Sequence, residues 1–447
     1  MNGASSFFLK IVPAMFRPRL EAALSTPSVA NSLWLIGDRL LRMGLGLLVG
    51  VWVARYLGPE GYGSLSFAGS YVMLFSALAM FGLESIVVRE LVQQPEQERT
   101  VLGATFLIRF VAGICAYLLA LGLLLFIRPG DWILLLLVAL LGSSLLLQAF
   151  ETVDLWFQSR VLSRYSVICR STAFILSSVA KVALVLCNFS LVAIVAATAF
   201  ETLLAALLLV IAYRRQSGIG ISGWQRDPAR LRSLLTTSVP MVLSGIVLMI
   251  YLRVDQVMLG VLASQTEVGL YAAAVRISEI WYFIPTAIVS SVFPGLIELR
   301  SGKPELFEQQ LQRLYNLLSF LGYAVALPVT VLAPWLVKLL FGAAYQQSAL
   351  LLSVLIWAGL FANLSVVRNA HFIALDWGRS LLWATSLGAA SNVLLNLLLI
   401  PRYGALGAAI ATCLSYWVAA HGACYTHRRL WPAGKMILKS LVMPRFW

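Results

Sequence analysis

Residues 101–150 read VLGATFLIRFVAGICAYLLALGLLLFI, RPGD and WILLLLVALLGSSLLLQAF, which are two apolar runs separated by a four-residue turn. The first run, 101–127, contains one charged residue, Arg109, and the second, 132–150, contains none. An apolar run of about 20 residues is long enough for a helix that crosses the hydrocarbon core of a bilayer. This stretch therefore predicts two membrane-spanning helices.

The same composition extends along the whole chain. Of its 447 residues, 60% are hydrophobic and only 12% are charged, and the mean hydropathy is +0.87. Soluble proteins have roughly 25% charged residues, so the water-soluble classes are excluded. We predict an all-α integral membrane protein with twelve transmembrane helices and no sizeable extramembrane domain. The expected spans are 31–54, 64–88, 101–127, 132–150, 165–187, 190–213, 234–260, 269–297, 314–333, 345–367, 379–400 and 405–427.

The two halves of the chain resemble each other at an offset of about 206 to 215 residues. Residues 61–68 resemble 267–274, and 213–215 resemble 427–429 at the ends of the sixth and twelfth spans. Two copies of six spans begin on the same face, which predicts two six-helix lobes related by a pseudo-two-fold axis along the membrane normal. The predicted parts are an N-terminal segment (1–30), the N-lobe (31–213), a basic linker (214–233), the C-lobe (234–427) and a C-terminal tail (428–447).

The basic residues predict the orientation. The two termini and the even-numbered connections contain 22 of the 33 Lys and Arg residues, whereas the odd-numbered connections contain only Arg55, Arg128, Lys338 and Arg402. Because basic loops stay in the cytoplasm, both termini are expected there, in a multi-pass protein of the cell (inner) membrane. Topology thus explains most of the net charge of +14, and no nucleic-acid partner is needed. Residues 5–16 are expected to form either a short interfacial helix or a mobile tail.

Twelve charged residues fall inside the predicted spans. A lone charge at the centre of a membrane helix costs roughly 2.5–3.5 kcal/mol, so these side chains must face one another or water. The cations outnumber the anions, which predicts a cationic interior that attracts an anion such as phosphate. The charged residues are Arg39, Arg42, Arg109, Arg170, Lys181, Arg253, Arg276, Asp38, Glu84, Glu201, Asp255 and Glu279.

Spacing predicts which of these charges share a helix face. Asp38 and Arg42 are four residues apart, and Arg276 and Glu279 are three apart. Arg170 and Lys181 lie on one stripe of the fifth span, about 16 Å apart along the helix. Arg253 and Asp255 point in different directions, so at least one of them needs a partner on another helix. The alternative for each charge is a structural ion pair, or snorkelling near a helix end for Arg109, Arg253 and Glu84.

No cofactor or metal site is expected. The five cysteines and three histidines lack metal-ligand or disulfide spacing, and no phosphate-loop or nucleophile motif is present. We therefore predict that the protein is not an enzyme.

Two short motifs carry a resemblance to a known family. Residues 55–63 (RYLGPEGYG) and 268–274 (VGLYAAA), the latter followed by Arg276-Ile277-Ser278-Glu279 and Phe293-Pro294, resemble the Wzx-type oligosaccharide flippases. These flippases belong to the multidrug/oligosaccharidyl-lipid/polysaccharide (MOP) exporter superfamily. The resemblance implies that two lobes rock about a central cationic cavity and carry a polyprenyl-pyrophosphate-linked oligosaccharide from the cytoplasmic to the outer leaflet.

The resemblance also assigns roles to the embedded charges. The pyrophosphate would meet Arg39, Arg42, Arg170, Lys181, Arg253 and Arg276. Asp38, Glu84, Asp255 and Glu279 would either couple transport to a proton or sodium gradient or form permanent ion pairs. The implied partners are membrane lipids, a polysaccharide polymerase and glycosyltransferases.

Two other functions compete with a flippase. A multidrug or small-molecule exporter of the same superfamily would need a net acidic lumen, which the count of embedded charges disfavours. A membrane enzyme acting on the same lipid-linked substrate, such as a glycan polymerase or ligase, would need a substantial external loop, and the expected external connections are short. The surface polymers that such a flippase serves are O-antigen, capsule, exopolysaccharide and teichoic-type polymers.

Overall fold

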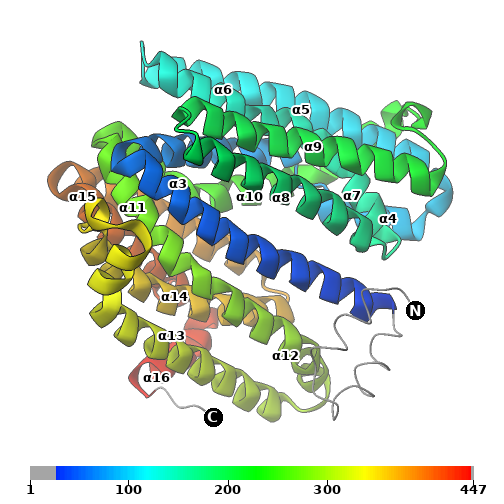
Figure 1. The fold of residues 1–447 in the computed structure, drawn as a ribbon. Helices are drawn as coiled ribbons and strands as arrows, with labels where there is room; N and C mark the ends of the chain where they lie inside the picture. The colour runs from blue at the N-terminus through cyan, green and yellow to red at the C-terminus, as the bar shows by residue number, and fades with distance from the viewer. Residues whose placement is uncertain (1–26, 444–447) are drawn as a thin grey trace, which may run out of the picture. The chain divides into compact units, whose positions relative to one another are not determined.

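The computed structural model describes residues 27–443, and these residues form an almost entirely helical protein (Figure 1). The predicted interfacial helix at 5–16 lies outside the described residues. The longer helices are α3 (Pro27–Met80), α4 (Glu84–Gln93), α5 (Glu98–Ile127), α6 (Trp132–Leu147), α7 (Thr152–Ser159), α8 (Ser163–Leu186), α9 (Leu191–Ser217), α10 (Pro228–Leu262), α11 (Gln265–Ser278), α12 (Phe283–Gly302), α13 (Pro304–Phe341), α14 (Ser348–Ala374), α15 (Gly378–Ala420) and α16 (Trp431–Val442). Short 3-10 turns join several of them, including η3 (Gln148–Glu151), η5 (Glu279–Tyr282) and η8 (Arg428–Leu430).

Ten helical stretches of the described chain are long and apolar enough to cross a membrane, which makes this a multi-pass membrane protein. Two of them are unusually long, at 60 residues (Trp34–Gln93) and 48 residues (Gly378–Tyr425). Each of the two contains a glycine outside helical geometry, Gly58 with φ 67° and Gly404 with φ 54°. Glycine accepts this left-handed conformation without a steric penalty, and Pro59 and Pro401 weaken the helix nearby. The twelve expected spans and the two-fold axis remain predictions.

The expected eighth span, 269–297, is interrupted in the structure. Helix α11 ends at Ser278, the turn η5 follows, and α12 begins at Phe283 and contains Pro294. A proline removes one helical hydrogen bond and favours such interruptions. The break falls just before Pro285.

The contacts within the chain group it into two units, which we describe separately. The described residues of unit 1 are 27–49, 78–119 and 139–242, and its core is built on Trp156, Tyr213 and their apolar neighbours. The two rings meet edge to face at 5.1 Å, and the indole of Trp224 donates to the Tyr213 hydroxyl at 2.9 Å. Trp224 belongs to the expected basic linker, so this part of the linker is packed against the unit.

The described residues of unit 2 are 50–77, 120–138 and 243–443. Its core gathers Leu311, Tyr315 and Leu364 from α13 and α14. Helix α16, which follows the twelfth expected span, buries Ala433 and Ile437 against this core. The units differ from the expected lobes in their ranges, and the lobe boundaries at 31–213 and 234–427 remain predictions.

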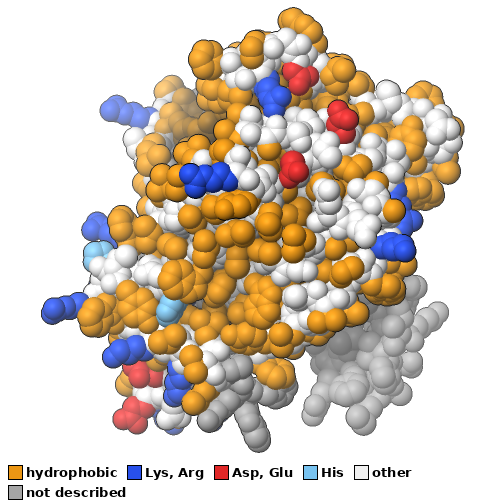
Figure 2. Space-filling model, turned by 90° about the vertical axis from the view of Figure 1, so that its left-hand side faces the viewer, with side chains coloured by type: hydrophobic (Ala, Val, Ile, Leu, Met, Phe, Trp, Pro, Cys, Tyr) orange, Lys and Arg blue, Asp and Glu red, His pale blue; other side chains and the backbone are white. Residues whose placement is uncertain are grey.

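Many large apolar side chains are exposed on the surface, including Phe126 (85%) and Val331 (78%). Figure 2 shows one face on which hydrophobic side chains predominate and charged ones are sparse. Such a surface would aggregate in water and suits a hydrocarbon environment.

Candidate functional site

A polar cavity of about 440 Å³ lies within unit 1. It is lined by α3, the end of α6, the turn η3, α8 and α9, and its wall carries charged side chains from these elements. The lining residues are Asp38, Arg42, Ser144, Leu147, Gln148, Glu151, Arg170, Glu201, Thr202, Ala205, Ala206 and Leu209.

Helix α3 contributes the first charged pair to this wall. Asp38 and Arg42 lie one turn apart, as their spacing predicted, and Arg42 Nε donates to Asp38 Oδ1 at 2.9 Å. Ser171 on α8 donates to the same oxygen at 2.6 Å. The Arg42 guanidinium also lies over the ring of Phe174 at 5.2 Å. The carboxylate and the ring thus fix the direction of the guanidinium.

Arg170 on α8 forms the second charged group, with two carboxylates. Its Nη2 lies 3.0 Å from Asp154 Oδ2 and 3.5 Å from Glu151 Oε1. Gln158 donates to the same Asp154 oxygen at 2.9 Å. Glu151 and Asp154 come from η3 and the short helix α7, which place both acids against one guanidinium.

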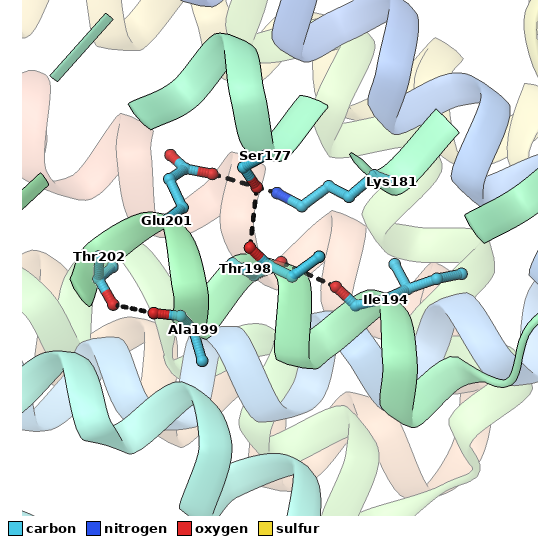
Figure 3. Close-up of polar contacts among 8 residues, drawn as sticks. Ser177, Lys181, Ile194, Thr198, Ala199, Glu201 and Thr202 are labelled. Atoms are coloured by element: carbon cyan, nitrogen blue, oxygen red, sulfur yellow. Dashed lines mark hydrogen bonds and ion pairs between the residues drawn. The ribbon is translucent and has the colours of Figure 1, made fainter. Parts of the chain in front are cut away.

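Lys181 and Glu201 form the third pair, between α8 and α9, which lie side by side (Figure 1). Figure 3 shows the ammonium group and the carboxylate pointing toward each other, with Nζ to Oε2 at 3.2 Å. Arg170 and Lys181 therefore lie on one helix as predicted; Arg170 faces two carboxylates and Lys181 faces one.

The cavity wall carries more carboxylates than cations. Its lining includes the carboxylates of Asp38, Glu151 and Glu201 and the guanidinium groups of Arg42 and Arg170. The expected count of embedded charges omitted two acids, Glu151 and Asp154. That count placed both acids in a connection after a fourth span ending at 150, although Asp154 is only 7% exposed. The spacing of two acids within an apolar segment, ETVDLWF, was the signal that could have indicated them.

Two further arginines, Arg109 and Arg368, are buried within the described residues. Arg109 on α5 is 1% exposed and interacts electrostatically with Glu84, Glu151 and Asp154, so it does not snorkel. Arg368 was expected in the connection after a tenth span ending at 367, and this placement is wrong. It lies inside α14, is 2% exposed and donates to the Ala419 carbonyl near the end of α15. A helix C-terminus carries partial negative charge, which stabilises a buried cation.

The other predicted site residues lie outside the cavity lining. In unit 2, Arg253 finds its partner in Glu279 at 3.5 Å. Asp255 accepts a hydrogen bond from Asn396 on α15 at 2.6 Å.

Arg276 is exposed, and its Nη2 lies 3.2 Å from the position that a Cβ on Gly50 would occupy. Exposed Arg39 belongs to unit 1, as does exposed Glu84 at the start of α4. Within residues 27–443, no three His, Cys, Asp or Glu side chains are grouped as metal ligands.

The two motifs that carried the family resemblance meet in unit 2. A Cβ on Gly63 would lie 1.7 Å from the Gln265 carbonyl oxygen, and one on Gly269 would lie 1.8 Å from the Pro59 carbonyl oxygen. Only glycine permits this backbone contact. Tyr345 anchors the same region by donating to the Ala54 carbonyl at 2.7 Å.

Comparison with known proteins identifies the family of this chain. Residues 28–300 match the family model described as polysaccharide biosynthesis protein. The chain belongs to this family. The match covers both resemblance motifs and the whole cavity wall.

Relatives of this family member are named as a flippase and a transporter. The chain is 26% identical to a probable low-salt glycan biosynthesis flippase, Agl15, of Haloferax volcanii over 48% of its own length, spanning 46% of that relative. It is 26% identical to a putative O-antigen transporter of Shigella flexneri over 86% of its own length and 93% of that relative.

Solved structures share the fold of this family member. The inward closed lipid II flippase MurJ superposes with a TM-score of 0.70 at 14% identity, covering 93% of this chain and 91% of MurJ. An inward-facing multidrug transporter of the MATE family superposes with a TM-score of 0.66 at 15% identity, covering 88% and 96%. At these identities, the two superpositions show that the fold is shared.

Proposed function

We propose that this polysaccharide biosynthesis protein is a flippase that moves a polyprenyl-pyrophosphate-linked oligosaccharide from the cytoplasmic to the outer leaflet. The observation that carries the proposal is the similarity to a putative O-antigen transporter along 93% of that relative. The embedded polar cavity supports it, because a glycan needs polar partners within the bilayer. The surface polymer it serves and its partner enzymes, a polymerase and glycosyltransferases, belong to the same proposal.

The proposed mechanism is alternating access by two six-helix lobes. It needs twelve crossings, and the breaks at Gly58 and Gly404 support them because each divides a helical stretch too long for one span. With an even number of crossings, the basic linker and both termini lie in the cytoplasm, and the protein lies in the inner membrane.

The diphosphate requires cations that are accessible to a mobile substrate. Arg39 and Arg276 are the exposed arginines among the predicted site residues and are proposed as its main partners. Arg42, Arg170, Lys181 and Arg253 would contribute only when their carboxylates release them, since each is ion-paired.

Coupling to a proton or sodium gradient is proposed to involve Asp255. Its oxygen is bonded by the amide of Asn396, which also donates to Asn392 at 2.9 Å. Asp38 and Glu279 face arginines, an arrangement that favours permanent ion pairs, and Glu84 is exposed.

One observation favours a second candidate, an exporter of organic cations. Three carboxylates line the cavity in unit 1, and a cationic compound would find counter-charges there. In this case the embedded arginines would serve only to hold the helices together.

The test is complementation of a strain that lacks the gene. We expect Arg39→Ala and Arg276→Ala to abolish surface glycan while the protein stays in the membrane at normal abundance. Arg313→Ala, on α13 outside the predicted site, is the control and should complement. Normal complementation by Arg39→Ala, Arg276→Ala and their combination would refute the diphosphate path, and resistance to cationic dyes without glycan export would favour the exporter.

A further inference from the structure

Within the described residues of unit 2, four arginines donate hydrogen bonds to backbone carbonyl groups in the last turn of a helix elsewhere in the unit. The last four carbonyl groups of a helix have no partner within it and carry partial negative charge, so a guanidinium group caps them favourably. The pairs are Arg55 with Leu339 and Leu340 of α13, Arg128 with Gly260 of α10, Arg300 with Ala374 of α14, and Arg368 with Ala419 of α15.

The four caps are of two kinds. Arg300 and Arg368 belong to the expected C-lobe, and so do the ends of α14 and α15 that they cap. Arg55 and Arg128 belong to the expected N-lobe, whereas the ends of α13 and α10 that they cap belong to the expected C-lobe. The second kind therefore joins the two expected lobes, and it has to break if the lobes separate there.

The two kinds also differ in what opening would cost. Arg368 is only 2% exposed, so its release would leave a buried charge without a partner. Arg55 is exposed and Arg128 is half-buried, so water can replace the carbonyl group when either of these caps opens. The acceptor is an uncharged carbonyl oxygen, and opening therefore leaves no carboxylate behind. The caps that join the lobes can open at a small net cost.

In the proposed orientation both of these caps lie at the outer face of the membrane. Arg55 and Arg128 are two of the four basic residues in the outer connections, and the others are Lys338 and Arg402. Basic residues are disfavoured on that side. The caps give two of them a purpose there, and Arg55 is the first residue of the family motif RYLGPEGYG.

Further contacts join the same two lobes beside the caps. The Tyr345 hydroxyl donates to the carbonyl of Ala54, the neighbour of Arg55, at 2.7 Å. Ser70 on α3 donates to Gln256 on α10 at 2.6 Å, and both side chains are buried. All of these residues belong to unit 2. We call these two contacts and the two caps the outer seam.

We infer that Arg55 and Arg128 are releasable latches that close the outer seam, and that both caps open each time the substrate leaves toward the outside. This inference rests on the proposed function, since a flippase that works by alternating access opens on its outer side once in every cycle. Arg300 and Arg368 are permanent caps in the same scheme, because each joins two parts of one lobe.

A covalent bridge in place of one latch distinguishes a releasable contact from a permanent one. In a background whose exposed native cysteines are replaced by serine, Arg55→Cys and Leu339→Cys are joined by a short bis-methanethiosulfonate reagent; both side chains are exposed. Spheroplasts with this protein then receive a labelled sugar, and the newly exported glycan is measured. We expect the bridge to lower export at least about tenfold, because a locked seam cannot change state, and dithiothreitol to restore it.

The matched control is a bridge within one lobe. Arg300 and Asp376 form an ion pair at 3.1 Å, both side chains are exposed, and both belong to the expected C-lobe. Bridging Arg300→Cys to Asp376→Cys should leave glycan export unchanged. Normal export by fully bridged Arg55→Cys, Leu339→Cys protein would overturn the inference, because a permanent cap tolerates a bridge. Mass spectrometry of the purified protein measures the bridged fraction.

Removal of the latches gives a second measurement. Ser70→Cys is the reporter, since the Ser70 side chain is only 5% exposed in the outer seam. Arg55→Met with Arg128→Met should raise its rate of labelling by an impermeant thiol reagent, added outside, at least about threefold, because the open state becomes more populated. Arg402→Met, at another exposed outer arginine, should leave the rate unchanged. Equal rates with and without the latches would overturn the inference even if the bridged protein does not fold.

The failure of this inference differs from the failure of the proposed function. If the wild-type gene restores surface glycan to the strain that lacks it, and the bridged protein also exports glycan, the flippase proposal survives and the latches do not. If the wild-type gene restores no glycan, the proposed function itself fails.

Discussion

At the residue scale, Arg109 is the buried side chain of unit 1 whose charge most needs compensation. It is 1% exposed, and its Nε and Nη2 form no hydrogen bond within residues 27–443. Its charge is compensated by nearby carboxylates, chiefly Glu151. The residue thus holds η3, α4 and α7 around α5 by electrostatic attraction through a medium of low dielectric constant.

We predict that Arg109→Met destabilises the protein strongly. Removal of one member of a buried charge cluster leaves carboxylates uncompensated, at about 3–5 kcal/mol. Thermal unfolding in detergent should show a clearly lower midpoint, whereas Arg99→Met, at an exposed position on the same helix, should match the wild type. An Arg109→Met protein as stable as the wild type would mean that the cluster contributes nothing to stability.

The pair between Lys181 and Glu201 permits a charge exchange. Lys181→Glu and Glu201→Lys each place like charges together across α8 and α9, and each should lower stability and surface glycan. The double exchange should recover most of the loss, with a coupling energy of roughly 0.5–3 kcal/mol in a double-mutant cycle. Losses that simply add would show that the two groups act independently.

Residue-level prediction succeeded where the partners lie on one helix. The spacing of Asp38 and Arg42 predicted their ion pair, which the structure confirms. It could not name Glu279 as the partner of Arg253, because that contact joins two helices whose relative rotation is set by packing. Glu151, Asp154 and Arg368 were missed because each lies within a few residues of an expected span boundary, where assignment by hydropathy is least certain.

At the element scale, the apolar runs predicted most of the long helices. The expected span 101–127 corresponds to α5, and 165–187 corresponds to α8. Hydropathy did not predict the turn η5 or helices α7 and α16, because backbone breaks and short amphipathic helices depend on local geometry and tertiary contacts. The two family motifs depend on this kind of backbone geometry, because Gly63 and Gly269 bring two backbone segments into contact.

This contact gives an element-scale prediction. Gly63→Ala or Gly269→Ala places a methyl group within 1.8 Å of a carbonyl oxygen or closer, so the helices that begin at these motifs must separate. We expect a loss of at least about 3 kcal/mol, the upper end of ordinary overpacking, with reduced abundance in the membrane. Gly44→Ala is the matched control, because a Cβ there meets nothing within 4 Å. Wild-type abundance and thermal midpoint in both motif variants would exclude a structural role for the contact.

At the scale of the whole molecule, the number of crossings determines the orientation of every loop. If the breaks at Gly58 and Gly404 separate individual spans, twelve crossings place residues 94–97 in the cytoplasm. If each long stretch crossed once, ten crossings would place the same residues outside. Charge and hydropathy favour the first arrangement, since the basic residues then lie on one side of the membrane.

We therefore predict the labelling of single cysteines by a membrane-impermeant maleimide in intact cells. Glu96→Cys should react only after the membrane is permeabilised, whereas Gln346→Cys, between α13 and α14, should react at once; both side chains are exposed. The exposed native cysteines Cys115 and Cys187 are first replaced by serine, and glycan export by this background shows that it is still functional. Labelling of Glu96→Cys in intact cells, with Gln346→Cys protected, would contradict twelve crossings with cytoplasmic termini, because that pattern requires either ten crossings or the reversed orientation.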